Sequence, residues 1–155
     1  EDPRGPFREG GILPLEQLVY FAEQFPATLV HVVNQAQRRA STLTMTPAGV
    51  AIQITYELCR LFDNPNAQLP YWRLIRSEET FHEFFVFVFL LIRDEAEAED
   101  WSGGNLAPVI EATRVQLRRF LGQGPSTVPQ LYQWASLRPP VAGATHLRVN
   151  TQTGL

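Results

Sequence analysis

Apolar residues recur with helical spacing through most of this chain. The first such stretch follows Pro14 and places apolar residues at i, i+3, i+4, i+7 and i+10, at Leu15, Leu18, Val19, Ala22 and Phe25. We therefore expect a helix with this stripe facing a core. Pro26 closes this helix and opens a second, from Ala27 to about Arg39, with an inner face of Leu29, Val30, Val33 and Ala36 or Gln37.

Two longer helices carry recognisable start signals. Thr46 is suited to an N-cap and Pro47 to the first helical position. The helix that they open extends to Phe62, and its inward set is Ala51, Ile54, Leu58, Leu61 and Phe62, flanked by Val50 and Ile52. A short helix is expected over 70–76. Ser77 followed by two glutamates then predicts a helix start, because carboxylates suit the positive end of the helix dipole.

The helix that begins after Ser77 is expected to run to about Glu95 and to contain the most apolar run of the chain, residues 84–92. Aromatic and β-branched residues favour strands, so a buried strand is the alternative. The capping signal before the run, the charges after it and the total length favour a helix. The run is well short of the ~20 residues that a membrane-spanning helix needs.

A last long helix is expected from about Asn105 to Leu121, with Leu106, Val109, Ile110, Thr113, Leu117, Phe120 and Leu121 inward. Proline and glycine then recur, and only Val128 to Leu137 is dense enough in apolar residues for a short helix. We predict an all-α, compact bundle of five to six helices over 1–121 and an irregular tail over 122–155. The tail wraps the domain or binds a partner, and its proline content favours ordering by a partner.

One core is expected to unite apolar residues from all of these segments, namely Tyr20, Phe21, Leu58, Phe81, Phe84 and Val88. The chain of 155 residues is the length of one domain. Its net charge is −3, and its basic residues form no cluster beyond two arginine pairs, which argues against nucleic acid as the main partner. All 13 basic residues are arginine. Lysine-based chemistry, including Schiff bases and phosphate-binding loops, is therefore excluded.

The remaining chemistry-bearing residues indicate no metal or cofactor site. Cys59 is the single cysteine and lies in an apolar helical pattern, which predicts a buried, inert thiol in a reducing, intracellular compartment. His31, His82 and His146 are far apart and lack metal-ligand spacing. We interpret His82, at the edge of an apolar helix, as a hydrogen-bonded structural histidine.

The stretch from Phe7 to Phe21 resembles the signature of the ELMO domain, which reads Asp-Phe-Arg-Gly-x-Gly-x-Leu, four residues, then Leu-x-Tyr-Phe. The residues that match at the family's spacing are Phe7, Arg8, Gly11, Leu13, Leu18, Tyr20 and Phe21. Pro6 and Glu9 stand where the family has Asp and Gly. Phe81 and His82, followed by Phe84, resemble the family's central helix, so the likeness covers about Phe7 to Leu121.

The resemblance implies a GTPase-activating protein for an Arf-like small GTPase, because single-domain ELMO proteins have this activity. Arg8 would be the catalytic arginine that enters the partner's nucleotide site, and Phe7, Glu9, Gly10 and Gly11 would contact the partner. Such an activator needs no cofactor of its own. The plain alternative for Arg8 is a solvated arginine, or one paired with Glu9 or Glu1.

A non-catalytic interaction module is the competing function. ELMO domains also occur in scaffolds, and the departures at Pro6 and Glu9 together with the long tail favour a stable part of a larger cytoskeletal or ciliary assembly. Both functions imply a cytoplasmic protein, which in the second case is associated with the cytoskeleton or a cilium. Because the chain starts inside the motif, we expect further residues upstream of Glu1 in the intact domain.

Overall fold

The structure is a computed structural model that describes residues 11–39, 46–63, 72–98 and 106–143. Its helices are α2 (Leu13–Gln24), α3 (Pro26–Arg39), α4 (Pro47–Asp63), α6 (Glu78–Ala98), α7 (Ala107–Gly122) and α8 (Val128–Trp134). A further helical turn covers 72–74, inside the short helix expected over 70–76. No strand occurs in these residues, so the predicted all-α class is confirmed, with seven helical segments rather than five to six.

The predicted start signals act as expected. The Gly49 amide donates to Thr46 Oγ1 at 3.1 Å, before α4, and the Thr80 amide donates to Ser77 Oγ at 3.2 Å, before α6. Each hydroxyl satisfies one of the backbone amides that a helix leaves without a carbonyl partner in its first turn. These two caps fix where α4 and α6 begin.

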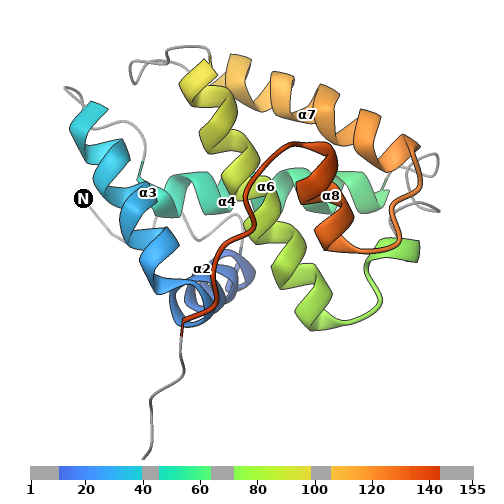
Figure 1. The fold of residues 1–155 in the computed structure, drawn as a ribbon, viewed down its shortest axis with the longest axis horizontal. Coiled ribbons are helices and arrows are strands. Elements are labelled where there is room, and N and C mark those ends of the chain that lie inside the picture. The colour runs from blue at the N-terminus through green and yellow to red at the C-terminus, as the bar shows by residue number, and fades with distance from the viewer. Residues whose placement is uncertain (1–10, 40–45, 64–71, 99–105, 144–155) are drawn as a thin grey trace, which may run out of the picture.

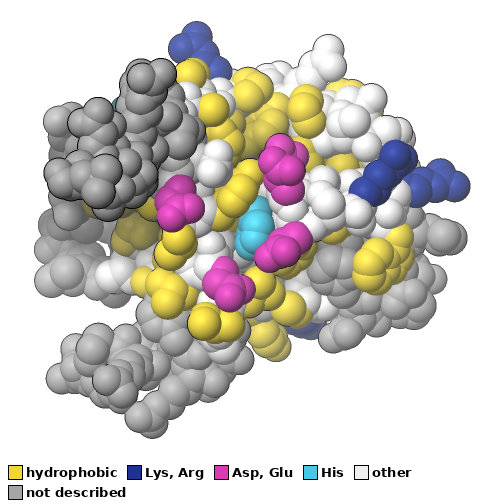
Figure 2. Space-filling view, turned by 90° about the horizontal axis from the view of Figure 1, so that it is seen from below, with side chains coloured by type: hydrophobic (Ala, Val, Ile, Leu, Met, Phe, Trp, Pro, Cys, Tyr) yellow, Lys and Arg dark blue, Asp and Glu magenta, His cyan; other side chains and the backbone are white. Residues whose placement is uncertain are grey.

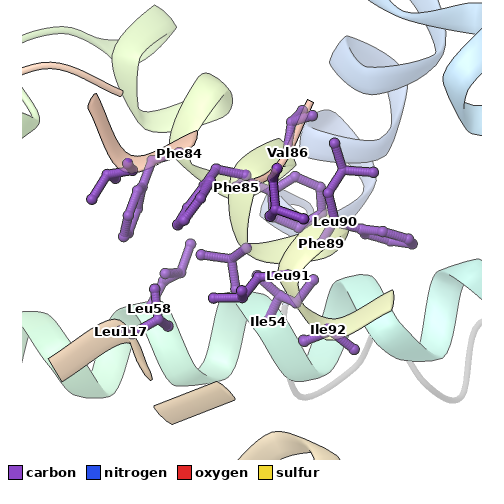
Figure 3. Close-up of a cluster of buried hydrophobic side chains, with 14 of the residues drawn as sticks. Ile54, Leu58, Phe84, Phe85, Val86, Phe89, Leu90, Leu91, Ile92 and Leu117 are labelled. Atoms are coloured by element: carbon purple, nitrogen blue, oxygen red, sulfur yellow. The ribbon is translucent and has the colours of Figure 1, made fainter. Parts of the chain in front are cut away.

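Helix α6 runs through the middle of the fold, with α4 and α7 packed on it (Figure 1). Every residue from Phe84 to Ile92 is buried, so this run is a helix surrounded on all sides and not a strand. Figure 3 shows Ile54 and Leu58 of α4 and Leu117 of α7 directed toward it. The predicted common core is confirmed, because Phe21, Leu58, Phe84 and Val88 are buried together and Tyr20 and Phe81 pack against them.

The C-terminal segment closes over α6. Leu131 and Tyr132 of α8 are buried, and the Tyr132 ring meets Phe87 edge-on with centroids 5.1 Å apart. The chain then descends to the end of α2, where the Gly143 amide donates to the Gln24 carbonyl at 2.8 Å (Figure 1). Of the two alternatives for the tail, wrapping of the domain holds for 128–137, because Val128, Leu131 and Tyr132 share one helix face and are buried. The proline content, which favoured ordering by a partner, does not prevent this burial. The domain boundary at 121 stays a prediction.

Charges between α4 and α7 are paired. Arg114 Nε donates to Glu57 Oε2 at 2.7 Å and its NH2 group donates to Oε1 at 2.5 Å, while NH1 reaches Glu111 at 2.7 Å. Burial alone would raise the pKa of Glu57, but the hydrogen bonds and charge of Arg114, helped by Arg60 and Gln53, hold that pKa below its ordinary value. This two-pronged contact joins the two helices that flank α6.

The buried side of α2 matches the predicted stripe only in part: Leu18 and Phe25 pack against the core. Pro14, Gln17 and Phe21 are buried, whereas Leu15 and Val19 are 47% and 46% exposed. The physical reason is nonlocal: Gln17 lies 2.6 Å from the Thr55 hydroxyl of α4, and Phe21 packs edge-on against Phe89 of α6. These two contacts set the rotation of the helix about its axis.

Two more burial predictions are wrong. On α3 the predicted inward residue Val30 is 57% exposed, and Val32 is buried instead. Leu29 and Val32 are three residues apart and form the helix face that packs against the core, and Val30 lies off this face. Cys59 is exposed, since it follows the inward-facing Leu58 by one position of the helix. The side chains of Ala36, Gln37 and Phe62 lie outside the described part of the chain.

A candidate partner-binding site at the start of helix α2

The start of α2 is a turn that only a flexible backbone allows. Gly11 has φ +65°, in the left-handed region that favours glycine, and it is exposed. The Ile12 carbonyl then accepts the amides of Leu15 and Glu16 at 3.0 and 3.1 Å, and Pro14 occupies the first turn. A side chain at position 11 would meet no atom within 4 Å, so the glycine serves conformation and not close packing.

Helix α2 is firmly attached behind this turn. Phe21 is fully buried in the core, and Gln17 is fully buried against Thr55. The Thr55 hydroxyl also lies 2.9 Å from the Ala51 carbonyl within α4, so one buried polar contact joins the two helices. Gln17 Nε2 has no hydrogen-bond partner among the described residues, so this contact satisfies only part of the buried amide, and the packing of Phe21 is the main anchor of the helix. The chain before Leu13 therefore leads into a helix whose position is fixed.

A ring stack joins α2 to α6 beside this anchor. The rings of Tyr20 and His82 lie 4.9 Å apart with planes 22° from parallel. His82 Nε2 is 3.7 Å from Glu78, and within the described residues Nδ1 is buried with no hydrogen-bond partner. The expectation that hydrogen bonds hold His82 in place is therefore wrong. The His82 ring is held by stacking on the Tyr20 ring. Burial raises the pKa of Tyr20, and the carboxylates of Glu83 and Glu79 raise it further.

The predicted site residues fall mostly before this region. Phe7, Arg8, Glu9 and Gly10 lie outside the described residues, and Gly11 is the one that the structure places. It lies at the exposed turn that leads into α2. The candidate site therefore leads into a positive-φ glycine, Gly11, followed by the anchored helix α2.

Three residues of the predicted inward stripe lie on the outer side of α2, namely Leu15, Val19 and Ala22, and Ile12 lies there with them. Ile12 is 68% exposed, and Leu15 and Val19 follow it at the spacing of one helix face. The signal was ambiguous because α2 carries apolar residues nearly all round, at Leu13, Leu15, Leu18, Val19 and Phe21 among others. No periodicity could decide which of the two stripes faces inward.

Other kinds of site find no support in the described ranges. Among those residues no group of three or more histidine, cysteine or acidic side chains lies close enough together to hold a metal ion. None of the helices within them combines the length and the apolar character needed to cross a bilayer.

The two sequence features that resembled one family, Tyr20-Phe21 and Phe81-His82, are far apart in the chain and meet in the ring stack between α2 and α6. A protein-family model, described as the ELMO/CED-12 family, matches residues 1–95. The chain belongs to the ELMO/CED-12 family. Comparison with curated proteins and with solved structures gave no significant match. In this ELMO-family chain the match ends within α6, while α7 and α8 complete the core around that helix.

Proposed function

We propose that this ELMO-family protein is a GTPase-activating protein for an Arf-like small GTPase and that Arg8 supplies the catalytic arginine. The observation that carries the proposal is the exposed, positive-φ Gly11 at the head of an anchored α2, three positions after Arg8 in a motif of the family. An activator of this kind requires an arginine that reaches outward from a base that does not move.

The chemistry asked of Arg8 is electrostatic. Negative charge on the transferred phosphoryl group grows in the transition state, and an arginine inserted by an activator stabilises it, typically by 10³ to 10⁵ in rate. The planar guanidinium can contact two oxygens together, which a lysine ammonium cannot do. The other proposed contacts, Phe7, Glu9, Gly10 and Gly11, would position this segment against the partner.

Single-turnover GTP hydrolysis by a panel of Arf-like GTPases tests the proposal. With the full chain we expect stimulation by the wild type and loss of at least about 10³-fold of that stimulation in Arg8→Ala, which is roughly 4 kcal/mol of transition-state stabilisation. Arg8→Lys should be nearly as defective. Arg4→Ala is the matched control, because Arg4 lies in the same segment but at the wrong spacing from Tyr20.

Unchanged stimulation in Arg8→Ala would refute the catalytic role of Arg8, and loss in Arg4→Ala alone would transfer that role to Arg4. Circular dichroism of each variant should match the wild type, because both substituted positions precede the first described helix, α2. A change in helicity would mean that the kinetic loss reports folding.

A non-catalytic interaction module is the second candidate. It is favoured by Glu9, a carboxylate next to Arg8 that could hold the arginine or repel a phosphate, and by the apolar outer side of α2. Under this function a GTPase or an assembly partner would bind, while wild type and Arg8→Ala would give equal hydrolysis rates. The same panel therefore separates the two candidates.

A further inference from the structure

Helix α2 presents an apolar strip to the outside of the molecule. We call Ile12, Leu15, Val19 and Ala22 the outer strip; all four are exposed. Their spacing of three and four places them along one side of the helix. The opposite side holds Gln17 and Phe21 in the core, so α2 is apolar both where it packs and where it does not.

Carboxylates border this strip. Glu16 and Glu23 lie four residues before and three residues after Tyr20, so helical geometry places them between the outer strip and the Tyr20–His82 stack. On α6, Glu79 and Glu83 lie close enough to Tyr20 to raise its pKa. We call Glu16, Glu23, Glu79 and Glu83 the acidic edge. Figure 2 shows acidic side chains gathered around a histidine, with hydrophobic side chains next to them.

The acidic edge has no paired cation among the residues that the structure describes. None of its four carboxylates forms an ion pair with another described residue. Burial raises the pKa of Glu83, and the like charge of Glu79, four residues earlier, adds to this effect. Negative potential therefore accumulates beside an apolar surface.

We propose that the outer strip and the acidic edge together dock a protein segment that carries an apolar ridge flanked by arginine or lysine, such as a basic amphipathic helix. Charge complementarity selects this occupant. A helix of that kind would lay its ridge along the outer strip and direct its cations toward the carboxylates. An anionic lipid surface would instead be repelled by the edge. This docking surface goes beyond GTPase activation and does not require Arg8.

A synthetic helical peptide of about 18 residues can probe the surface, with leucines at i, i+3, i+4 and i+7 and arginines beside them. Fluorescence anisotropy of the labelled peptide against the full chain should give saturable binding. Leu15→Ser combined with Val19→Ser should weaken it at least about tenfold, and Glu16→Lys combined with Glu23→Lys by a similar factor. Binding should also fall as salt is raised, because exposed charges are screened.

Matched controls lie elsewhere on the surface. Val115→Ser removes a valine of α7 that is 57% exposed, and Asp94→Lys reverses an exposed carboxylate on α6, so both should leave the affinity within about twofold. Equal weakening by the controls and the site variants would overturn the proposal as nonspecific charge attraction, and so would failure of the peptide to bind at millimolar concentration.

Three further outcomes would assign the surface to another occupant. Sedimentation showing a dimer that Leu15→Ser and Val19→Ser dissociate would make a second copy the occupant. Peptide binding that appears only after residues 1–10 are removed would make the chain's own N-terminal segment the occupant. Stronger binding to phosphatidylserine vesicles than to the peptide would make it a membrane. Each of these would refute the proposed partner, and none bears on the hydrolysis assay with Arg8→Ala.

Discussion

The seam between α4 and α7 and the surface formed by α2 and α6 both carry carboxylates, but among the described residues only the seam pairs its carboxylate with an arginine. Glu57 receives two hydrogen bonds from Arg114, and its pKa is lowered. Glu83 has no ion pair within the described residues, and burial with the nearby Glu79 raises its pKa. In a chain of net charge −3, charges that hold helices together come with their partners, and charges left without them are available to another molecule.

The largest expected effect separates the two sides of α2. Phe21→Ala should lower the free energy of unfolding by about 3 to 5 kcal/mol, because it leaves a cavity beside Phe89 in the core. Val19→Ser, two residues earlier on the outer strip, should change it by less than about 0.5 kcal/mol. Urea unfolding followed by circular dichroism measures both. Comparable losses would mean that Val19 is buried in solution and that the outer strip is already covered.

The next effect tests the α4–α7 seam. Arg114→Ala should lower the free energy of unfolding by about 2 kcal/mol, because it leaves the largely buried Glu57 carboxylate without its partner. This loss is smaller than for a fully buried pair because the Arg114 side chain is 30% exposed. Arg118→Ala, on the exposed side of the same helix, is the control and should be near neutral. Equal stability of the two variants would show that the pair contributes no net stabilisation.

A smaller effect is expected in the pH dependence of the stability that Glu57 contributes. The pKa of Glu57 is lowered in the folded protein, so its contribution is fully present above the ordinary value of 4.5 and is lost as the pH falls through the folded pKa. Glu57→Gln should therefore unfold at a lower temperature than the wild type near pH 7, and the two melting temperatures should converge as the pH falls below 4.5 and through the folded pKa of Glu57. A gap that stays constant over this range would exclude the ion pair as its cause.

The smallest effect is a stabilisation, and it is expected from removing a charge of the acidic edge. The folded pKa of Glu83 is raised, so the native state binds its proton more tightly than the unfolded state does, and the ionised carboxylate costs stability above that pKa. Glu83→Gln should raise the melting temperature slightly at pH 7, by the equivalent of up to about 0.5 kcal/mol, and should lose this advantage as the pH falls from the folded pKa to 4.5. A destabilised Glu83→Gln at pH 7 would contradict the view that the edge is uncompensated.

The sequence predicted the helices well because their signals are local. Caps at Thr46 and Ser77 and a proline at position 26 are read from a few neighbouring residues, and the structure places helix starts at each. The apolar run 84–92 was resolved as a helix by the signals at its ends, although its own composition also suits a strand. Local chemistry decides where such a helix begins and ends.

Which side of a helix faces inward was predicted less well where several stripes are apolar. The rotation of α2 about its axis is set by the contact between Gln17 and Thr55. The sequence around residue 17 contains no signal that would predict this contact with residue 55. Val30 was misplaced for a similar reason, because Leu29 and Val32 could be recognised as the packing face only with the neighbouring helices in place. For the candidate site, Gly11 adopts a left-handed backbone conformation. Its contact with a partner and the role of Arg8 stay predictions.

The hydrogen bond from Gly143 to Gln24 has a kinetic consequence. It joins chain positions near the two ends of the described region, so forming it closes a long loop, and the exposed residues 138, 139, 141 and 142 before it bury little apolar surface in return. Such a contact opens in local fluctuations that leave the rest of the protein folded. The Gly143 amide should therefore exchange with deuterium far sooner than the amides of Phe87 to Leu91, whose exchange requires unfolding of the whole bundle.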